Sequence, residues 1–293
     1  MKPELIGIIA ALISAASWAA GSFLFKRIGE SVSPFGMTLV KGTISIVFLG
    51  LALAVTGYGS ISTNAVFLLC LSGVIGIAVA DTLFFAALQD LGPVALVVFF
   101  MMGQILTAVL AIFFLGEMPP LKAWAGIFLT LAGIGTVLWH KISLDKDSKR
   151  SGIRGTILGA LSMICMSTST IIAKPALDSV STIFATLLRM TSGTLCILLF
   201  GIFTQQVKDW LAPVRNMQMV SRFVFSVAVV TFGGFWLSLV AIKYVDVAIA
   251  STLSATEPLF LIPMAIVLFK EKISAWEVVG IVSATSGVFL IIT

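Results

Sequence analysis

Four charged residues lie inside long apolar stretches of this chain and are the first candidates for chemistry. Lys41 and Arg189 are cations, and Asp81 and Glu257 are carboxylates. A charge inside a membrane-spanning segment is costly, so it usually faces the protein interior, finds a partner and marks a substrate or ion pathway. We expect these residues to bind a small solute or to carry a coupled proton, or else to form structural ion pairs.

Lys41 and Asp81 are expected to lie at the same depth in neighbouring helices. Lys41 lies about seven residues into its apolar run, and Asp81 lies about eight residues before the end of the next run. At about 1.5 Å per residue, both lie roughly 10–12 Å from the same membrane surface. The two side chains can therefore pair, either as a fixed brace or as a contact that breaks during function.

Arg189 and Glu257 are the corresponding candidates in the second half of the chain. Glu257 falls near the middle of its run and precedes Pro258, which removes one helical hydrogen bond. Irregular backbone at this depth lines cavities in transporters. Glu257 is expected to pair with Arg189 or to titrate, and its protonation state stays open because burial and a nearby cation act on it in opposite directions.

Further candidates are polar or aromatic residues near the middle of the apolar runs. With two acids and two cations, such a lining suits a zwitterion, for example an amino acid. A mid-span tryptophan more often packs against helices than contacts a ligand, so both roles stay open. The candidates are Trp18, Trp236, Gln104, Ser14 and Thr256, together with Ser17, Ser22, Thr168, Ser251 and Ser254.

Composition places these residues in a membrane protein. Of 293 residues, 59% are hydrophobic and 11% are charged, against about 25% charged in soluble domains, and the mean hydropathy is +1.14. The net charge of +5 therefore concerns membrane topology rather than nucleic-acid binding. The chain has one histidine and no CxxC, HExxH or GxSxG pattern, so we expect neither an enzyme nor a metal or cofactor site.

Ten apolar runs are long enough to cross a bilayer, which predicts an all-α membrane protein with ten transmembrane helices. A hydrophilic linker at 141–152 divides them into two groups of five, within 1–140 and 153–293. The expected spans are 5–25, 34–56, 65–89, 93–114, 121–139, 153–173, 182–204, 219–243, 247–269 and 275–292.

The two groups repeat one another in a common register. A shift of 148 residues superimposes the early spans and brings Lys41 onto Arg189, and a shift of 154 superimposes the later ones and brings Glu117 onto Glu271. Because five is an odd number, the second group enters the membrane in the opposite orientation. The expected architecture is two inverted five-helix repeats, an arrangement in which alternating-access transporters place their site between the repeats.

The acids differ in how they follow this repeat. The symmetric glutamates at the ends of the fourth and ninth spans suit a scaffold or the edge of a gate. Asp81 and Glu257 instead align with uncharged Phe235 and Gly103. A scaffold is expected to be symmetric whereas a substrate is not, so this asymmetry favours a functional role for both acids.

Glycines mark a helix-packing face in the last span of each repeat. Gly126 and Gly133 lie on one face of the fifth span, and Gly280 and Gly287 lie on the equivalent face of the tenth. Small residues allow helix backbones to approach closely in lipid. We expect packing within the bundle, with homodimerisation as the alternative, so a monomer and a homodimer both stay open.

Basic residues predict the orientation in the membrane. Twelve lie in loops on the side of the 141–152 linker, and four lie on the side that holds both termini. The positive-inside rule then predicts a cytoplasmic linker and outside termini. The expected location is a bacterial or archaeal plasma (inner) membrane, which the chain crosses several times.

Four segments carry a resemblance to the EamA domain. "FLGEMPPLKAWAGIFLTLAGIGTVL" and "LFKEKISAWEVVGIVSATSGVFLII" are similar to its closing pattern, in which a glutamate ends the fourth helix and small residues line the fifth. "ALISAASWAAGSFLFK" resembles its opening helix, and "ASTLSATEPLFLIPMAIVLFKEKIS" resembles its fourth helix, including Pro258. Two tandem copies cover essentially the whole chain, which therefore resembles a ten-helix member of the drug/metabolite transporter superfamily.

This resemblance implies a secondary transporter, often an exporter or exchanger, for a small metabolite such as an amino acid or nucleotide sugar, with H⁺ as a possible coupling ion. Gln104 departs from the pattern by replacing the first-repeat proline, and Lys41 stands where the family often has arginine. The first helix lacks the glutamate of the four-helix multidrug relatives, which disfavours transport of drug-like cations. A channel is the least favoured alternative.

Overall fold

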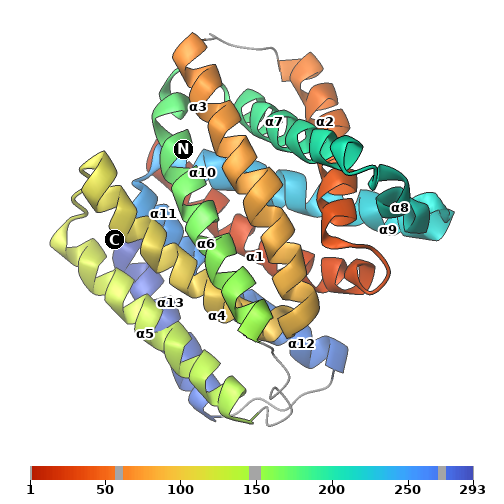
Figure 1. Cartoon of the computed structure of the whole chain (residues 1–293). Coiled ribbons are helices and arrows are strands. Elements are labelled where there is room, and N and C mark those ends of the chain that lie inside the picture. The colour runs from red at the N-terminus through yellow and green to blue at the C-terminus, as the bar shows by residue number, and fades with distance from the viewer. Residues whose placement is uncertain (1, 57–61, 145–152, 270–274, 293) are drawn as a thin grey trace.

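The computed structural model of the chain describes residues 2–56, 62–144, 153–269 and 275–292, and this part is helical without β-strands (Figure 1). Helices suit so apolar a chain because lipid offers no water to backbone polar groups, which a helix pairs internally. Within these described ranges, six helices are long and apolar enough to cross a membrane: Pro3–Gly29, Pro34–Thr56, Thr63–Gly92, Ile153–Asp178, Thr182–Phe203 and Met217–Tyr244.

The first half of the chain forms α1 to α5, with a π-helical segment inside its third long helix. The elements are α1 (Pro3–Gly29), α2 (Pro34–Thr56), α3 (Thr63–Gly73), η1 (Val74–Ala80), α4 (Asp81–Leu115) and α5 (Leu121–Leu144). Gly92 interrupts α4 with a left-handed φ of 78°, so the helical path changes between the expected spans 65–89 and 93–114.

The second half contains corresponding elements and an additional short helical connection between α7 and α9. The elements are α6 (Ile153–Ala173), η3 (Lys174–Asp178), α7 (Thr182–Phe203), α8 (Val207–Leu211), η4 (Ala212–Arg215), α9 (Met217–Ala228), η5 (Val229–Trp236), α10 (Leu237–Tyr244), α11 (Val247–Ser254), α12 (Glu257–Phe269) and α13 (Ala275–Ile292).

Six of the expected spans coincide with the six long apolar helices. Three others overlap shorter apolar helices, and 275–292 coincides with α13. The shorter helices are Met102–Leu115, Leu121–Gly133 and Val247–Leu261. The architecture of two helical repeats is thus present, and the number of ten crossings stays a prediction.

The repeat register predicted from the sequence also orders contacts in the structure. Ser14 donates a hydrogen bond of 3.0 Å to the carbonyl oxygen of Gly234, and Ser162 donates one of 2.8 Å to that of Ala80. The shifts of 148 and 154 residues convert one contact into the other. The first helix of each repeat therefore packs against the third helix of the other repeat. Such reciprocal contacts are expected of two repeats related by a two-fold axis.

The two π-helical segments occupy equivalent positions. A shift of 154 residues places η1 on the start of η5, and Asp81, which follows η1, on Phe235. π-Helical turns are rare and frequent at functional sites. Both segments lie beside the first helix of the opposite repeat, since α1 contacts η5 and α6 contacts η1.

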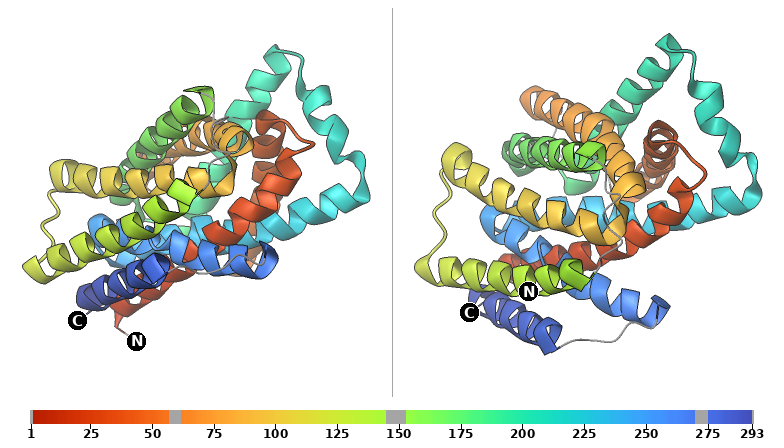
Figure 2. Two further views of the ribbon diagram at one scale, coloured as in Figure 1. Left: turned by 90° about the horizontal axis from the view of Figure 1, so that it is seen from below. Right: turned by 60° about the horizontal axis from the view of Figure 1, so that its bottom comes forward.

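Helices α5 and α13 pack side by side at one edge of the bundle (Figure 2). A Cβ atom on Gly133 would lie 2.5 Å from the backbone nitrogen of Ala284 and 2.6 Å from the carbonyl oxygen of Gly280. One on Gly287 would lie 2.7 Å from the carbonyl oxygen of Gly126. Glycine is required for this close approach, and the two faces cover each other within one chain.

Glu117 links the end of α4 to the start of α11. Its carboxylate accepts hydrogen bonds from the backbone N–H groups of Val247 at 2.9 Å and Ala248 at 3.0 Å. These N–H groups belong to the first helical turn and have no partner within the helix. Glu117 therefore caps a helix of the other repeat. Its mate Glu271 and residues 145–152 of the expected linker lie outside the described residues.

Candidate functional site

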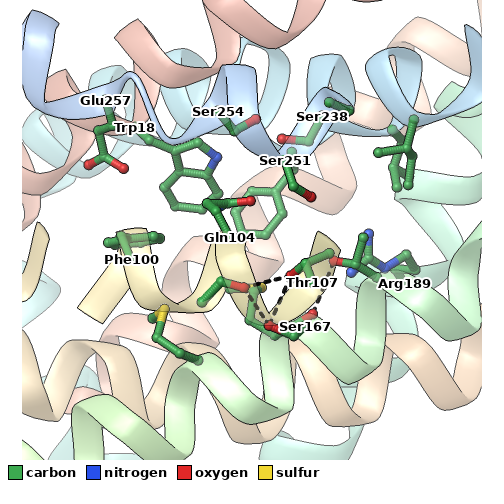
Figure 3. A pocket seen from close by; sticks show the side chains of 18 residues that line it. Trp18, Phe100, Gln104, Thr107, Ser167, Arg189, Ser238, Ser251, Ser254 and Glu257 are labelled. Atoms are coloured by element: carbon green, nitrogen blue, oxygen red, sulfur yellow. Dashed lines mark hydrogen bonds between the residues drawn. The ribbon is translucent and has the colours of Figure 1, made fainter. Parts of the chain in front are cut away.

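A cavity lies where the two repeats meet, between α1, α4, α6, α7, η5, α10, α11 and α12. Arg189 and Glu257 lie at its opposite ends, with Gln104 between them (Figure 3). The other polar side chains in its wall are Trp18, with its indole N–H, and six that carry hydroxyls: Thr107, Ser167, Thr170, Ser238, Ser251 and Ser254. Most are small side chains, which leave space that large residues would fill.

Helix α7 brings Arg189 to one end of the cavity. Its side chain is buried, and one terminal nitrogen donates a hydrogen bond of 2.9 Å to the hydroxyl of Ser169. Its Nε has no hydrogen-bond partner among the described residues. A buried polar nitrogen without a partner is costly, so this guanidinium retains binding capacity for a group with acceptor oxygens.

Glu257 reaches the other end because the ninth expected span is broken. Helix α11 ends at Ser254, and α12 begins at Glu257. The break coincides with Pro258, where the sequence indicates irregular backbone. The buried carboxylate accepts a hydrogen bond of 3.4 Å from the hydroxyl of Ser22.

Three aromatic rings form part of the cavity wall. The ring of Trp18 packs on Phe235, with centroids 4.7 Å apart, and on Phe100, with centroids 6.1 Å apart. All three rings belong to the cavity wall. An apolar portion of a ligand can therefore contact these rings while its charged groups reach the two ends.

Lys41 and Asp81 form a buried ion pair, the pairing that their depths in the sequence allow. The ammonium also lies 4.3 Å from the ring centroid of Phe235 and 5.5 Å from that of Phe85. Neither charged residue belongs to the described cavity lining. The ring of Phe235 has the ammonium beside it and also contributes to the cavity wall.

Thr107 and Ser167 join α4 to α6 at the cavity wall. Their hydroxyl oxygens lie 2.9 Å apart, and each is within 2.9 Å of the carbonyl oxygen of Gly103 (Figure 3). Gly103 is the residue that aligns with Glu257 in the repeat. The first repeat thus provides neutral hydrogen-bonding groups where the second provides an acid.

Several sequence candidates lie outside the described lining. Ser14 contacts Ser238, a lining residue, through hydroxyl oxygens 2.7 Å apart. The indole nitrogen of Trp236 donates to the hydroxyl of Thr182 at 3.0 Å. Thr256 donates to the carbonyl oxygen of Leu253 within the α11–α12 break. Trp18, Gln104, Arg189 and Glu257, together with Ser251 and Ser254, are the sequence candidates that line the cavity. Arg189 and Glu257 form no ion pair with each other.

The sequence reasoning missed the contribution of α6. Met163, Met166, Ser167 and Thr170 all line the cavity, and their spacing of i, i+3, i+4 and i+7 places them on one helix face. That spacing is visible in the sequence, and it would have directed attention to Ser167 rather than to Thr168. The hydroxyl of Thr168 donates to the carbonyl oxygen of Ile164 in its own helix instead.

Comparison with known proteins identifies the family of the chain. The model of the EamA-like transporter family matches residues 5–139 and 153–293. A solved crystal structure of a protein matches with a TM-score of 0.73 and 15% sequence identity, covering 98% of this chain and 95% of that chain, a likeness of fold alone. No curated protein matches the chain.

Proposed function

Because the chain belongs to the EamA-like transporter family, we propose that it is a secondary transporter that exports or exchanges a small zwitterionic metabolite such as an amino acid. The substrate occupies the cavity between the two repeats, which open it to the two membrane faces alternately. The observation that carries this proposal is a single cavity with a buried cation at one end and a buried carboxylate at the other.

Each end of the cavity suits one end of a zwitterion. The guanidinium of Arg189 offers planar donors that match a carboxylate, and its Nε has no partner among the residues that the structure describes. Glu257 suits an ammonium group or a coupled proton. The hydroxyl groups and Gln104 suit the polar part of a small solute, and Trp18 suits its apolar side chain.

A second candidate substrate is an organic cation. Glu257 shares its end of the cavity with Trp18 and Phe100 (Figure 3), and aromatic faces attract cations. In that case Arg189 is a structural group, and replacing it leaves transport intact. A nucleotide sugar requires a larger anion-binding surface, so it also depends on Arg189.

The membrane arrangement of the proposed transporter follows from the charges of its loops. We place the chain in a bacterial or archaeal plasma membrane as ten crossings, with residues 141–152 inside and both termini outside. An epitope tag inserted after residue 146 is then accessible to antibody only in permeabilised cells. Labelling of the tag in intact cells contradicts this orientation and leaves the substrate proposal unaffected.

Counterflow in proteoliposomes tests the proposed function directly. Vesicles loaded with unlabelled amino acids are expected to accumulate the matching radiolabelled amino acid with saturable kinetics. Arg189→Met and Glu257→Gln are expected to abolish this exchange while eluting as folded protein in size-exclusion chromatography. Thr168→Ala is the matched control, because its hydroxyl lies on α6 outside the described cavity lining.

Each pattern of loss has a distinct meaning. Wild-type exchange in both charge variants contradicts the proposed site. Loss in Glu257→Gln alone, with transport of organic cations, supports the second candidate. Large single-pore currents without exchange indicate a channel.

A further inference from the structure

Lys41 and Arg189 occupy equivalent positions of the two repeats but have different surroundings. Lys41 pairs with Asp81 and lies outside the described cavity lining, whereas Arg189 lines the cavity and donates to one hydroxyl, that of Ser169. Both side chains are buried, with exposed fractions of 1% and 6%. The two repeats therefore place a cation at the same position, paired with a carboxylate in the first repeat and facing the cavity in the second.

Asp81 pairs with Lys41 and lies one helical turn from a glycine that Arg189 approaches. Its carboxylate pairs with Lys41, and its backbone N–H donates to the carbonyl oxygen of Gly76, the residue beside which the Arg189 guanidinium lies. In the second repeat the position of Asp81 is taken by Phe235, whose ring lies 4.3 Å from the Lys41 ammonium. Lys41 thus contacts both members of one equivalent pair, Asp81 by charge and Phe235 by its ring face.

Arg189 also lies close to the helix that carries Asp81. One terminal nitrogen lies 3.2 Å from where a Cβ atom on Gly76 would be. Gly76 belongs to η1, five residues before Asp81. Because Gly76 has no side chain, the Arg189 guanidinium can approach this helix closely.

A single carboxylate can neutralise only one of the two cations at a time. Leaving a buried charge unpaired is strongly destabilising. The cation that Asp81 leaves therefore requires another anionic partner. In this structure that cation is Arg189, and it faces the cavity.

Inverted repeats relate the two access states of a transporter, because each repeat adopts in one state the arrangement of the other repeat in the opposite state. Applied to this chain, that exchange gives Arg189 the surroundings of Lys41, and Lys41 those of Arg189. We propose that Asp81 alternates between Lys41 and Arg189 during transport, and that the cation it leaves binds an anionic group of the substrate, a carboxylate in the first instance. Arg189 binds it in the state described here, and Lys41 binds it from the opposite side of the membrane.

This inference rests on the proposed function and adds a second anion-binding position, at Lys41, which the present cavity does not include. A fixed Lys41–Asp81 brace makes a different prediction, because the access states then do not depend on the charge of Arg189. The two cases differ in which membrane face reaches the cavity when one cation is removed.

A cysteine reporter in the cavity measures that access without any substrate. Ser254→Cys, in a background with Cys70, Cys165 and Cys196 replaced by serine, is reacted with a membrane-impermeant thiol reagent in right-side-out and inside-out vesicles. The unmodified charge set is expected to label from both faces. Arg189→Met leaves Asp81 only Lys41, so labelling is expected from one face, with a decrease of about tenfold or more from the other.

Lys41→Met is expected to shift labelling to the face that Arg189→Met excludes. Lys41→Arg and Arg189→Lys are matched controls that keep both charges, and they are expected to label from both faces. If Lys41→Met does not fold, Arg189→Met still decides the question, because the Lys41–Asp81 pair is intact in it.

Two outcomes of the methionine variants overturn the exchange alone. Arg189→Met labelling from both faces at the unmodified ratio contradicts it, as does a shift toward the same face in both methionine variants. The proposed function survives either result, because the unmodified charge set still shows access from both faces. Labelling of that parent from one face only contradicts alternating access and the exchange together.

Discussion

Phe100 and Ser254 occupy equivalent positions in the two repeats, but their side chains fill different amounts of the space between the helices. Both line the cavity, but Phe100 carries a large ring that packs edge to face on Phe84, with ring centroids 5.3 Å apart, whereas Ser254 carries a small hydroxyl side chain. Phe84 itself aligns with Ser238, another lining residue. Large rings in the first repeat therefore fill space whose counterpart in the second repeat is left open by small hydroxyl side chains.

This asymmetry predicts that Phe100→Ser extends the cavity toward the opposite membrane face. Removing the ring leaves space beside Trp18 and Phe84 and gives the first repeat the residue of its mate. With the cysteine reporter at position 254, labelling is expected to become several-fold faster than in the parent from the membrane face at which the parent reacts more slowly. Phe113→Ser, which changes an exposed ring in the same helix, is the control, and an equal effect of both substitutions contradicts the role of Phe100.

Glu117→Ala is predicted to loosen α11, because two backbone N–H groups at the start of that helix lose their acceptor. Losing a helix cap typically costs about 0.5–2 kcal/mol, and α11 also carries Ser251 and Ser254 of the cavity wall. The expected result is a lower free energy of unfolding in denaturant titration, together with faster labelling of the cavity reporter. Glu4→Ala changes an exposed acid near the amino terminus and should alter neither measurement.

Gly133→Val is predicted to destabilise the bundle, because the new side chain meets the backbone of α13. Overpacking of this kind typically costs about 1–3 kcal/mol. Gly50→Val is the matched control, since a Cβ atom there meets nothing within 4 Å. A loss of dimer in Gly133→Val without a loss of stability would instead support the face as a homodimer interface.

Asp81→Asn is predicted to destabilise the protein by about 3–5 kcal/mol, because Lys41 is left as a buried charge without its partner. The double variant Lys41→Met with Asp81→Asn removes both charges and is expected to recover much of that loss. Unfolding titrations of the two single variants and the double variant measure this coupling. Additive losses would show that the pair contributes no interaction energy.

Much of the fold is predictable from the sequence because lipid imposes simple requirements on the chain. A run of about 20 apolar residues forms a helix when its backbone has no water to bind. The break at Gly92 and the interruption before Pro258 follow from local backbone chemistry, as does the glycine face of α5. The inverted repeat could also be predicted from the sequence, since it depends only on residue spacing and on the odd number of expected spans in each half.

The residues that line the cavity were harder to predict from the sequence. Trp18, Gln104, Arg189 and Glu257 were candidates because their types are unusual in an apolar run, and all four line it. Ser167 escaped notice because a serine in a helix is common, and only its neighbours in space show what it contacts.

The sequence alone determined that charges at Lys41, Asp81, Arg189 and Glu257 are embedded in apolar helices and that the first and third of these are equivalent. Hydropathy and residue spacing are local quantities, and they carry this information. Only the tertiary structure decided that Asp81 pairs with Lys41 and that Arg189 is the cation at the cavity. That choice depends on which helix faces touch and on where side chains such as Phe100 fill the space between them, and these contacts join residues far apart in the chain.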